Sequence, residues 1–179
     1  IRHFGPDKAR ETARCAAKTA GDWVVGFGMG GAEDAGTASD FSYAFDMARD
    51  AGLRLTSHAG EWGGAQSIWD TLENLKVERI GHGVHAINDP KLVNHLAETG
   101  IVLEVNPGSN VALGVYPSLA EHPISKLRDA GVKVTVSTDD PPFFHTTMTS
   151  EFDQLERVFG WGVDDFKQLN QTALEAAFC

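Results

Sequence analysis

The chain has 179 residues, of which 42% are hydrophobic and 22% are charged. These proportions are those of a globular domain and exclude a disordered or fibrous protein. Fifteen Lys and Arg residues against twenty-five Asp and Glu residues give a net charge of −10, the wrong sign for a surface that binds nucleic acid or anionic lipid.

The ends of the chain and its cysteines set further limits. No run of about 18 apolar residues is present to span a bilayer, and the first residues carry no secretory pattern, so we expect a cytoplasmic protein. The first residue is Ile1 rather than Met, so we expect the natural start to lie upstream. Two cysteines, Cys15 and Cys179, form neither a disulfide framework nor a cysteine-rich zinc site. Cys15 is expected in the core, on the apolar side of a helix.

The spacing of apolar residues predicts helices that alternate with strands along the chain. The first helix follows Pro6-Asp7 and ends before Gly21. The other predicted helices run from Ser39 to Gly52, over 65–75, from Asp89-Pro90 to Gly100, and near 123–130. The predicted strands span residues 23–27, 53–56, 77–80, 101–105 and 132–136.

This alternation predicts the fold class. Strands separated by helices at intervals of about 25 to 45 residues require right-handed crossovers and parallel pairing. No linker interrupts the pattern, so residues 1–179 are expected to form a single α/β domain. The chain is shorter than the roughly 200 to 400 residues of a complete eight-stranded α/β barrel.

Polar residues follow each predicted strand at its C-terminal end. In a parallel sheet or barrel these positions converge on one rim, where active sites form. The segments at this rim are Gly28–Glu33, Ser57–Glu61, Gly81–Gly83, Asn106–Asn110 and Ser137–Pro142.

A metal ion would explain the histidines and carboxylates at this rim. Zinc accepts imidazole nitrogen and carboxylate oxygen, and it lowers the pKa of a bound water to roughly 7. His58 and Asp139 are the candidate ligands. Glu61, three residues after His58, is a candidate proton carrier, and His82 a candidate for orienting a metal-bound hydroxide.

Four of these segments resemble, in order and spacing, the successive motifs of the adenosine deaminase family. They are Ser57-His58-Ala59-Gly60-Glu61, Arg79-Ile80-Gly81-His82-Gly83, Leu103-Glu104-Val105-Asn106-Pro107-Gly108-Ser109-Asn110 and Ser137-Thr138-Asp139-Asp140-Pro141. The resemblance covers nearly the whole chain. It implies a zinc-dependent (β/α)8 barrel that hydrolyses the 6-amino group of adenosine to give inosine and ammonia.

The resemblance also implies roles for single residues. His58 and Asp139 would ligate one zinc ion per active site, Glu61 would protonate the purine N1, and His82 would position the attacking hydroxide.

Two further roles concern substrate binding. Asp140 would hydrogen-bond the substrate, and the backbone of Gly31 would contact the purine ring.

The chain departs from the family pattern at its start. The family takes two more zinc ligands from a His-x-His motif at the end of the first barrel strand, and this chain has no such motif. Arg2-His3 resembles the end of the third barrel strand. We therefore expect a partial barrel that lacks the first two strands and most of the third. The missing zinc ligands are expected upstream of Ile1, and this part of the barrel is expected to be inactive alone.

Several functions remain open. A purine nucleoside is the expected small-molecule partner, with adenosine preferred over adenine, because deaminases of the free base tend to carry Ser-Ser-Glu where this chain has Gly31-Ala32-Glu33. A relative that binds purine without turnover is a second class. Amidohydrolases that act on other amines or cyclic amides are a third class, which the motif pairing disfavours. The sequence assigns no oligomeric state.

Overall fold

The computed structural model describes residues 1–178, which contain a five-stranded parallel sheet. Its strand order is the chain order, and neighbouring strands pair in parallel. The strands are β1 (Gly26–Met29), β2 (Arg54–Ala59), β3 (Arg79–His82), β4 (Val102–Val105) and β5 (Val134–Val136). The five strands match the expected partial (β/α)8 barrel, and they form an open sheet rather than a closed barrel.

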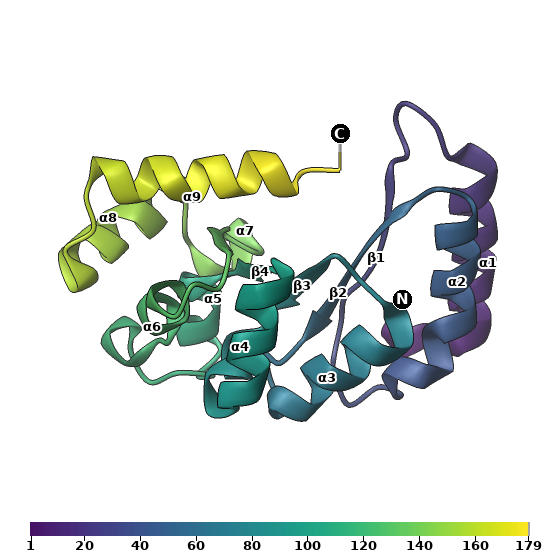
Figure 1. Cartoon of the computed structure of the whole chain (residues 1–179), viewed down its shortest axis with the longest axis horizontal. Helices are drawn as coiled ribbons and strands as arrows, with labels where there is room; N and C mark the ends of the chain where they lie inside the picture. Colours follow the sequence, from purple (N-terminus) through teal and green to yellow (C-terminus); the bar gives the residue numbers. More distant parts are fainter. Residues whose placement is uncertain (179) are drawn as a thin grey trace.

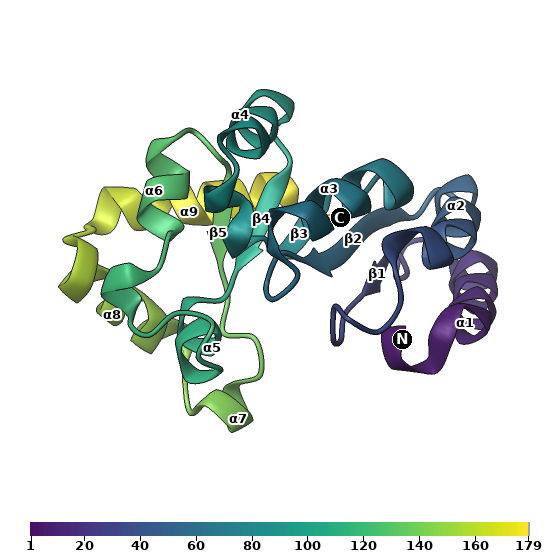
Figure 2. The same cartoon turned by 90° about the horizontal axis from the view of Figure 1, so that it is seen from below.

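Helices connect the strands and cover the sheet. The α-helices are α1 (Gly5–Thr19), α2 (Ser42–Asp50), α3 (Gly64–Leu75), α4 (Pro90–Thr99), α5 (Pro107–Ala112), α6 (Ile124–Asp129), α7 (Pro141–Phe144), α8 (Met148–Phe159) and α9 (Val163–Ala176). Short 3-10 helices lie at Arg2–Phe4, Ala38–Phe41, Val84–Asn88 and Leu119–Glu121. Helices α1 and α2 lie beyond β1, whereas α6 and α8 lie near the β5 end (Figures 1 and 2).

The predicted alternation is confirmed, with shifts at the element ends. The first strand was expected over residues 23–27 and runs instead over Gly26–Met29. Gly21 and Val24 close a turn through a backbone hydrogen bond, and Trp23 is 95% exposed, so the apolar run begins outside the sheet. Cys15 is exposed, and its expected place in the core was wrong.

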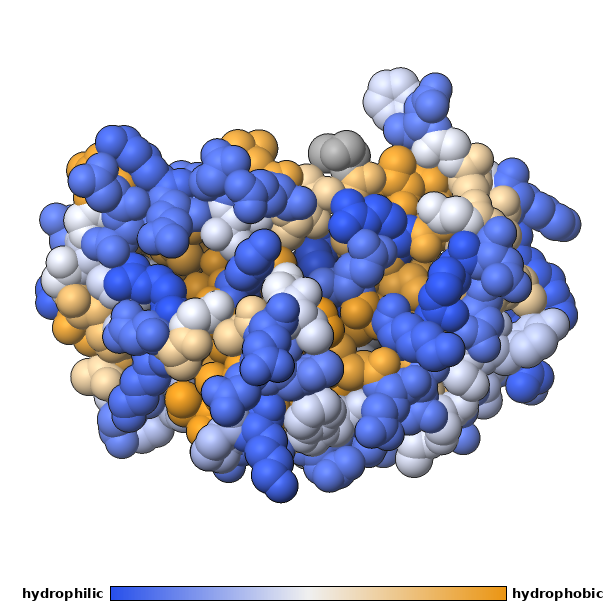
Figure 3. All heavy atoms as spheres, viewed as in Figure 1, coloured by the Kyte–Doolittle hydropathy of each residue, from blue (hydrophilic) through white to orange (hydrophobic). Residues whose placement is uncertain are grey.

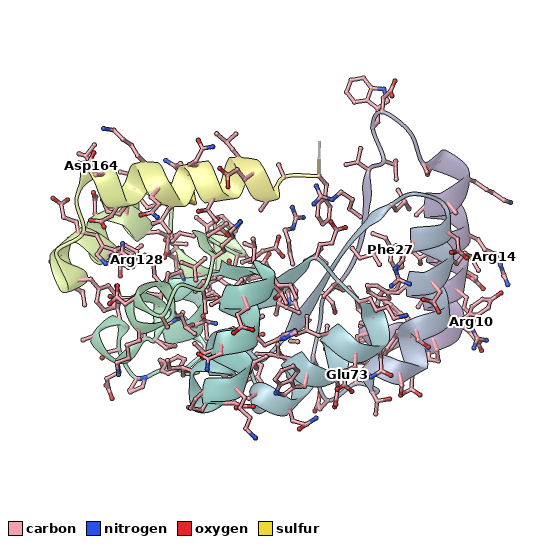
Figure 4. The ribbon with its side chains drawn as sticks, viewed as in Figure 1. Arg10, Arg14, Phe27, Glu73, Arg128 and Asp164 are labelled. Atoms are coloured by element: carbon pink, nitrogen blue, oxygen red, sulfur yellow. The ribbon has the colours of Figure 1, made fainter. Side chains whose placement is uncertain are left out.

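The core lies between the sheet and its helices. Phe27 lies on β1 (Figure 4). Its ring meets that of Phe45 on α2 edge to face, with centroids 5.1 Å apart. Ile68 on α3 and Leu103 on β4 are completely buried. The surface in Figure 3 is mostly hydrophilic, with apolar residues visible in the hollow near its centre. Among residues 1–178, no helix combines the length and apolar character needed to cross a bilayer.

Candidate active site

The ends of strands β2 and β3 bring two histidines together. His58 pairs with Gly81, and Ala59 with His82, in the parallel register. The two imidazole rings meet edge to face, with centroids 4.8 Å apart. The predicted convergence of these side chains on one rim is therefore observed.

Two site residues have left-handed backbones. His82 has φ 64° and Asp139 has φ 58°. Residues other than glycine rarely adopt this region, and such strain concentrates at functional sites. The backbone thus aims both side chains into the site at a conformational cost.

Glycines on or next to the neighbouring strands make room for the His58 ring. A Cβ on Gly81 would lie 2.5 Å from Cδ2 of His58, and a Cβ on Gly30 would lie 3.2 Å from its Cε1. A side chain at Gly81 would therefore displace the imidazole.

His58, Glu61 and His82 form a compact group of polar ligand atoms. One such atom from each residue lies within 4.8 Å of the others. Nε2 of His82 is 3.7 Å from Oε2 of Glu61 and 3.9 Å from Oδ2 of Asp139. Ser109 donates a 2.7 Å hydrogen bond to that same oxygen of Asp139, a contact that the sequence did not identify.

Burial sets the protonation states of these groups. Desolvation, followed by the negative charges of Asp139 and Glu33, raises the pKa of Glu61 to about 7. Desolvation lowers the pKa of His58 and of His82. Near neutral pH the site thus combines neutral imidazoles with a carboxyl group that can hold a proton.

Glu33 fastens the loop that carries Glu61. Its carboxylate accepts hydrogen bonds from the backbone N–H groups of Gly60, Glu61 and Gly63, at 3.1, 2.6 and 2.8 Å, and from the hydroxyl of Ser67 at 2.9 Å. Burial acts to raise the pKa of Glu33, but these hydrogen bonds outweigh it and the pKa is lowered. The sequence placed Glu33 at the rim but gave it no role, because its partners lie about thirty residues away.

All six residues singled out in the sequence line one cavity of about 750 Å³. They are Gly31, His58, Glu61, His82, Asp139 and Asp140. Trp62, Leu113 and Phe144 add apolar surface to its wall. Apolar walls with a few convergent polar groups are typical of small-molecule sites.

The donor set fits a zinc ion. The side-chain hydrogen bonds that His58 receives from Arg2 and Ser57 end on its backbone carbonyl, and within residues 1–178 its ring makes none. A neutral imidazole without a partner, in the cavity that Asp139 also lines, offers together with that carboxylate the nitrogen and oxygen ligands that zinc accepts.

Comparisons with known proteins find relatives over the whole chain. The sequence model of the family described as adenosine deaminase matches residues 1–179. An adenine deaminase of Rhizobium johnstonii is 51% identical over 177 residues, which are 99% of this chain and 55% of that protein. The chain therefore spans about half the length of this relative.

Two solved structures share the fold. The crystal structure of an adenine deaminase from Arthrobacter aurescens superposes with a TM-score of 0.93 at 32% identity, over 99% of this chain and 54% of that one. The structure of an amidohydrolase from Burkholderia ambifaria with bound Zn gives a TM-score of 0.91 at 30% identity, over 99% and 50% of the two chains.

Proposed function

The chain belongs to the adenosine deaminase family, and from this premise we propose that it is the C-terminal part of a zinc-dependent enzyme that hydrolyses adenine to hypoxanthine and ammonia. The observation that carries the proposal is the convergence of His58, Glu61, His82 and Asp139 on one cavity, in a chain about half identical to adenine deaminases.

The proposed substrate is the free base rather than the nucleoside. The preference for adenosine rested on Gly31-Ala32 alone, whereas the similarity to adenine deaminases extends over 99% of the chain. Adenosine remains the second candidate because of that dipeptide.

The zinc ion, when bound, would polarise a water and lower its pKa toward 7. His58 and Asp139 would hold the ion, together with ligands upstream of Ile1. The Ser109 hydroxyl holds the Asp139 carboxylate in place through its 2.7 Å hydrogen bond.

Glu61 would carry the proton that the reaction requires. Addition of the water oxygen to C6 breaks the aromaticity of the ring before the amine leaves as ammonia, so negative charge builds on N1 unless a proton arrives there. With its pKa raised to about 7, Glu61 retains a proton near neutral pH, and the Glu33 carboxylate fixes its backbone.

The remaining residues would bind and orient the substrate. His82 would orient the attacking water through its ring. Asp140 would hydrogen-bond the purine, and the backbone of Gly31 would face its ring; both residues border the cavity.

The test is turnover by a full-length protein that contains this sequence. Ammonia release is measured with adenine and with adenosine as substrates. We expect kcat/KM for adenine to exceed that for adenosine by about 100-fold or more, because a site built for one substrate leaves polar groups unpaired with the other. A preference for adenosine would identify a nucleoside deaminase. Purine binding without ammonia release would support the non-enzymatic alternative instead.

A further inference from the structure

Buried polar side chains form a hydrogen-bonded row that begins at His82 and extends away from the site. Asn110, on α5, is completely buried, and His122, just before α6, is 2% exposed. Nδ2 of Asn110 lies 3.2 Å from Nδ1 of His82. Oδ1 of Asn110 lies 3.1 Å from Nε2 of His122. Nδ1 of His122 lies 3.2 Å from the backbone nitrogen of Ile124.

The backbone amide of Ile124 fixes the direction of this row. A backbone N–H can only donate, so Nδ1 of His122 must accept. Burial lowers the pKa of His122 to about 4, so its ring is neutral near pH 7 and carries its single proton on Nε2. That proton is donated to Oδ1 of Asn110.

The orientation of the Asn110 amide then determines which ring nitrogen of His82 carries the proton. With Oδ1 occupied by His122, the amide presents its NH2 group to Nδ1 of His82, which must accept. We propose that Asn110 and His122 are positioning residues that hold the proton of the neutral His82 ring on Nε2. Asn106 also places its Nδ2 3.3 Å from Nδ1 of His82 and 3.5 Å from Nε2, and the former contact supports the same assignment.

The consequence is a defined donor in the site. The Nε2–H of His82 points to the side of the ring where Glu61 and Asp139 lie, 3.7 and 3.9 Å away. There it can donate to a water oxygen and orient that water for attack. The opposite tautomer would present a lone pair to the same water and leave the buried Nδ1–H facing an amide donor. The catalytic value of the tautomer rests on the proposed function, whereas the tautomer itself does not.

The tautomer is read directly by NMR. Full-length, zinc-loaded protein is labelled with ¹⁵N-histidine, and long-range ¹H–¹⁵N correlations show which nitrogen of each ring carries the proton. We expect His82 to be protonated on Nε2 and to accept on Nδ1. A proton on Nδ1 of His82 in the unsubstituted protein would overturn the proposal.

Three variants test whether the hydrogen-bonded row from Ile124 through His122 and Asn110 sets the tautomer of His82. We call this row the relay. Asn110→Asp replaces the donor with an acceptor, and we expect the His82 proton to move to Nδ1 and kcat to fall about 100-fold or more, with a smaller change in KM. His122→Gln can still accept from Ile124 and donate to Asn110, so it should retain the Nε2 tautomer and kcat within a few fold. Asn94→Asp makes the same chemical change on the exposed face of α4 and should alter neither the tautomer nor kcat.

The outcomes separate the two proposals. If Asn110→Asp is folded and the His82 tautomer is unchanged, the relay does not set it. If Asn110→Asp does not fold, loss of the Nε2 tautomer in His122→Gln would also contradict the relay. If the tautomer behaves as expected but the full-length protein releases no ammonia from either purine, the proposed function fails and the relay stands.

Discussion

At the scale of single residues, surroundings rather than residue type distinguish the carboxylates of the site. Glu33 is charged because backbone N–H groups surround it, and its pKa is lowered despite burial. Glu61, on the loop that Glu33 fastens, has the opposite shift, because it is desolvated and faces two other negative charges. Two neighbouring acids with opposite shifts are suited to different tasks, one to anchoring and one to proton transfer.

Glu61→Gln tests the proton-transfer task. The amide keeps the size of the side chain but cannot pass a proton to the substrate, so we expect kcat of the full-length protein to fall about 100- to 10,000-fold, with a smaller change in KM. Glu73→Gln, on the exposed face of α3 (Figure 4), is the matched control and should leave kcat unchanged. A Glu61→Gln protein with near-normal kcat would remove Glu61 from the chemistry.

At the scale of elements, the ends of parallel strands and the glycines beside them build the site. His58 lies on β2, but glycines on or next to the adjoining strands leave the space for its ring. The position of the ring therefore depends on three neighbouring segments at once.

Gly81→Ala tests this dependence. The added Cβ would meet the His58 ring at 2.5 Å, so the ring must move from its position near Asp139. We expect zinc affinity of the full-length protein to weaken about 10- to 100-fold, as is common when ligand positioning is disturbed. Affinity is measured by competition with a chelator.

The matched control for this substitution is Gly21→Ala. A Cβ at Gly21 meets nothing within 4 Å, so this variant should bind zinc normally. Unchanged zinc affinity in Gly81→Ala would show that the space beside Gly81 does not position the His58 ring.

The spacing of apolar residues predicted the alternating helices and strands, and the polar residues after each strand predicted the rim where the site lies. Helix stops at Gly52, Gly100 and Gly131, each followed directly by an apolar run, identified three of the five strands to within a few residues. Helices α5 and α7 were not predicted, since each is short and begins at a proline within a rim loop. The long helices α8 and α9 were also not assigned.

The rim residues themselves were predictable, whereas their supports were not. The carboxyl ends of parallel strands meet at one edge, so His58, His82 and Asp139 could be brought together from sequence order alone. The contacts of Glu33 with the Glu61 loop and of His122 with Asn110 depend on side-chain orientation across separate elements. No periodicity in the sequence encodes such contacts.

At the scale of the whole molecule, the site lies on an open sheet. The chain spans about half the length of the relatives it resembles, and a sheet that is part of a closed barrel has edges that the rest of that barrel would pair. Stability and zinc binding are therefore properties to measure on a full-length protein.

The buried histidines make stability depend on pH. His122 has a folded-state pKa of about 4, below its ordinary value near 6.5. Between these values the unfolded chain binds a proton that the folded protein does not, so the free energy of unfolding falls as the pH drops from about 6.5 toward 4. The contribution of His122 is on the order of 3 kcal/mol, and the lowered pKa values of His58 and His82 act in the same direction.

Urea unfolding of the full-length protein between pH 4.5 and 7 measures this effect. We expect the midpoint of the unsubstituted protein to fall with decreasing pH more steeply than that of His122→Gln, which has no titrating ring at this position. His145→Asn, at an exposed histidine with a left-handed backbone that asparagine tolerates, should follow the unsubstituted protein. Parallel curves for all three proteins would contradict the assigned titration of His122.

The central claim is that strand ends distant in the chain assemble a zinc site for purine hydrolysis. A crystal structure of a full-length protein that contains this sequence, with anomalous data collected at the zinc edge, tests it most directly. We predict an anomalous peak about 2.0–2.2 Å from an imidazole nitrogen of His58 and from a carboxylate oxygen of Asp139. A zinc-loaded protein whose ion lies away from both side chains would contradict the account.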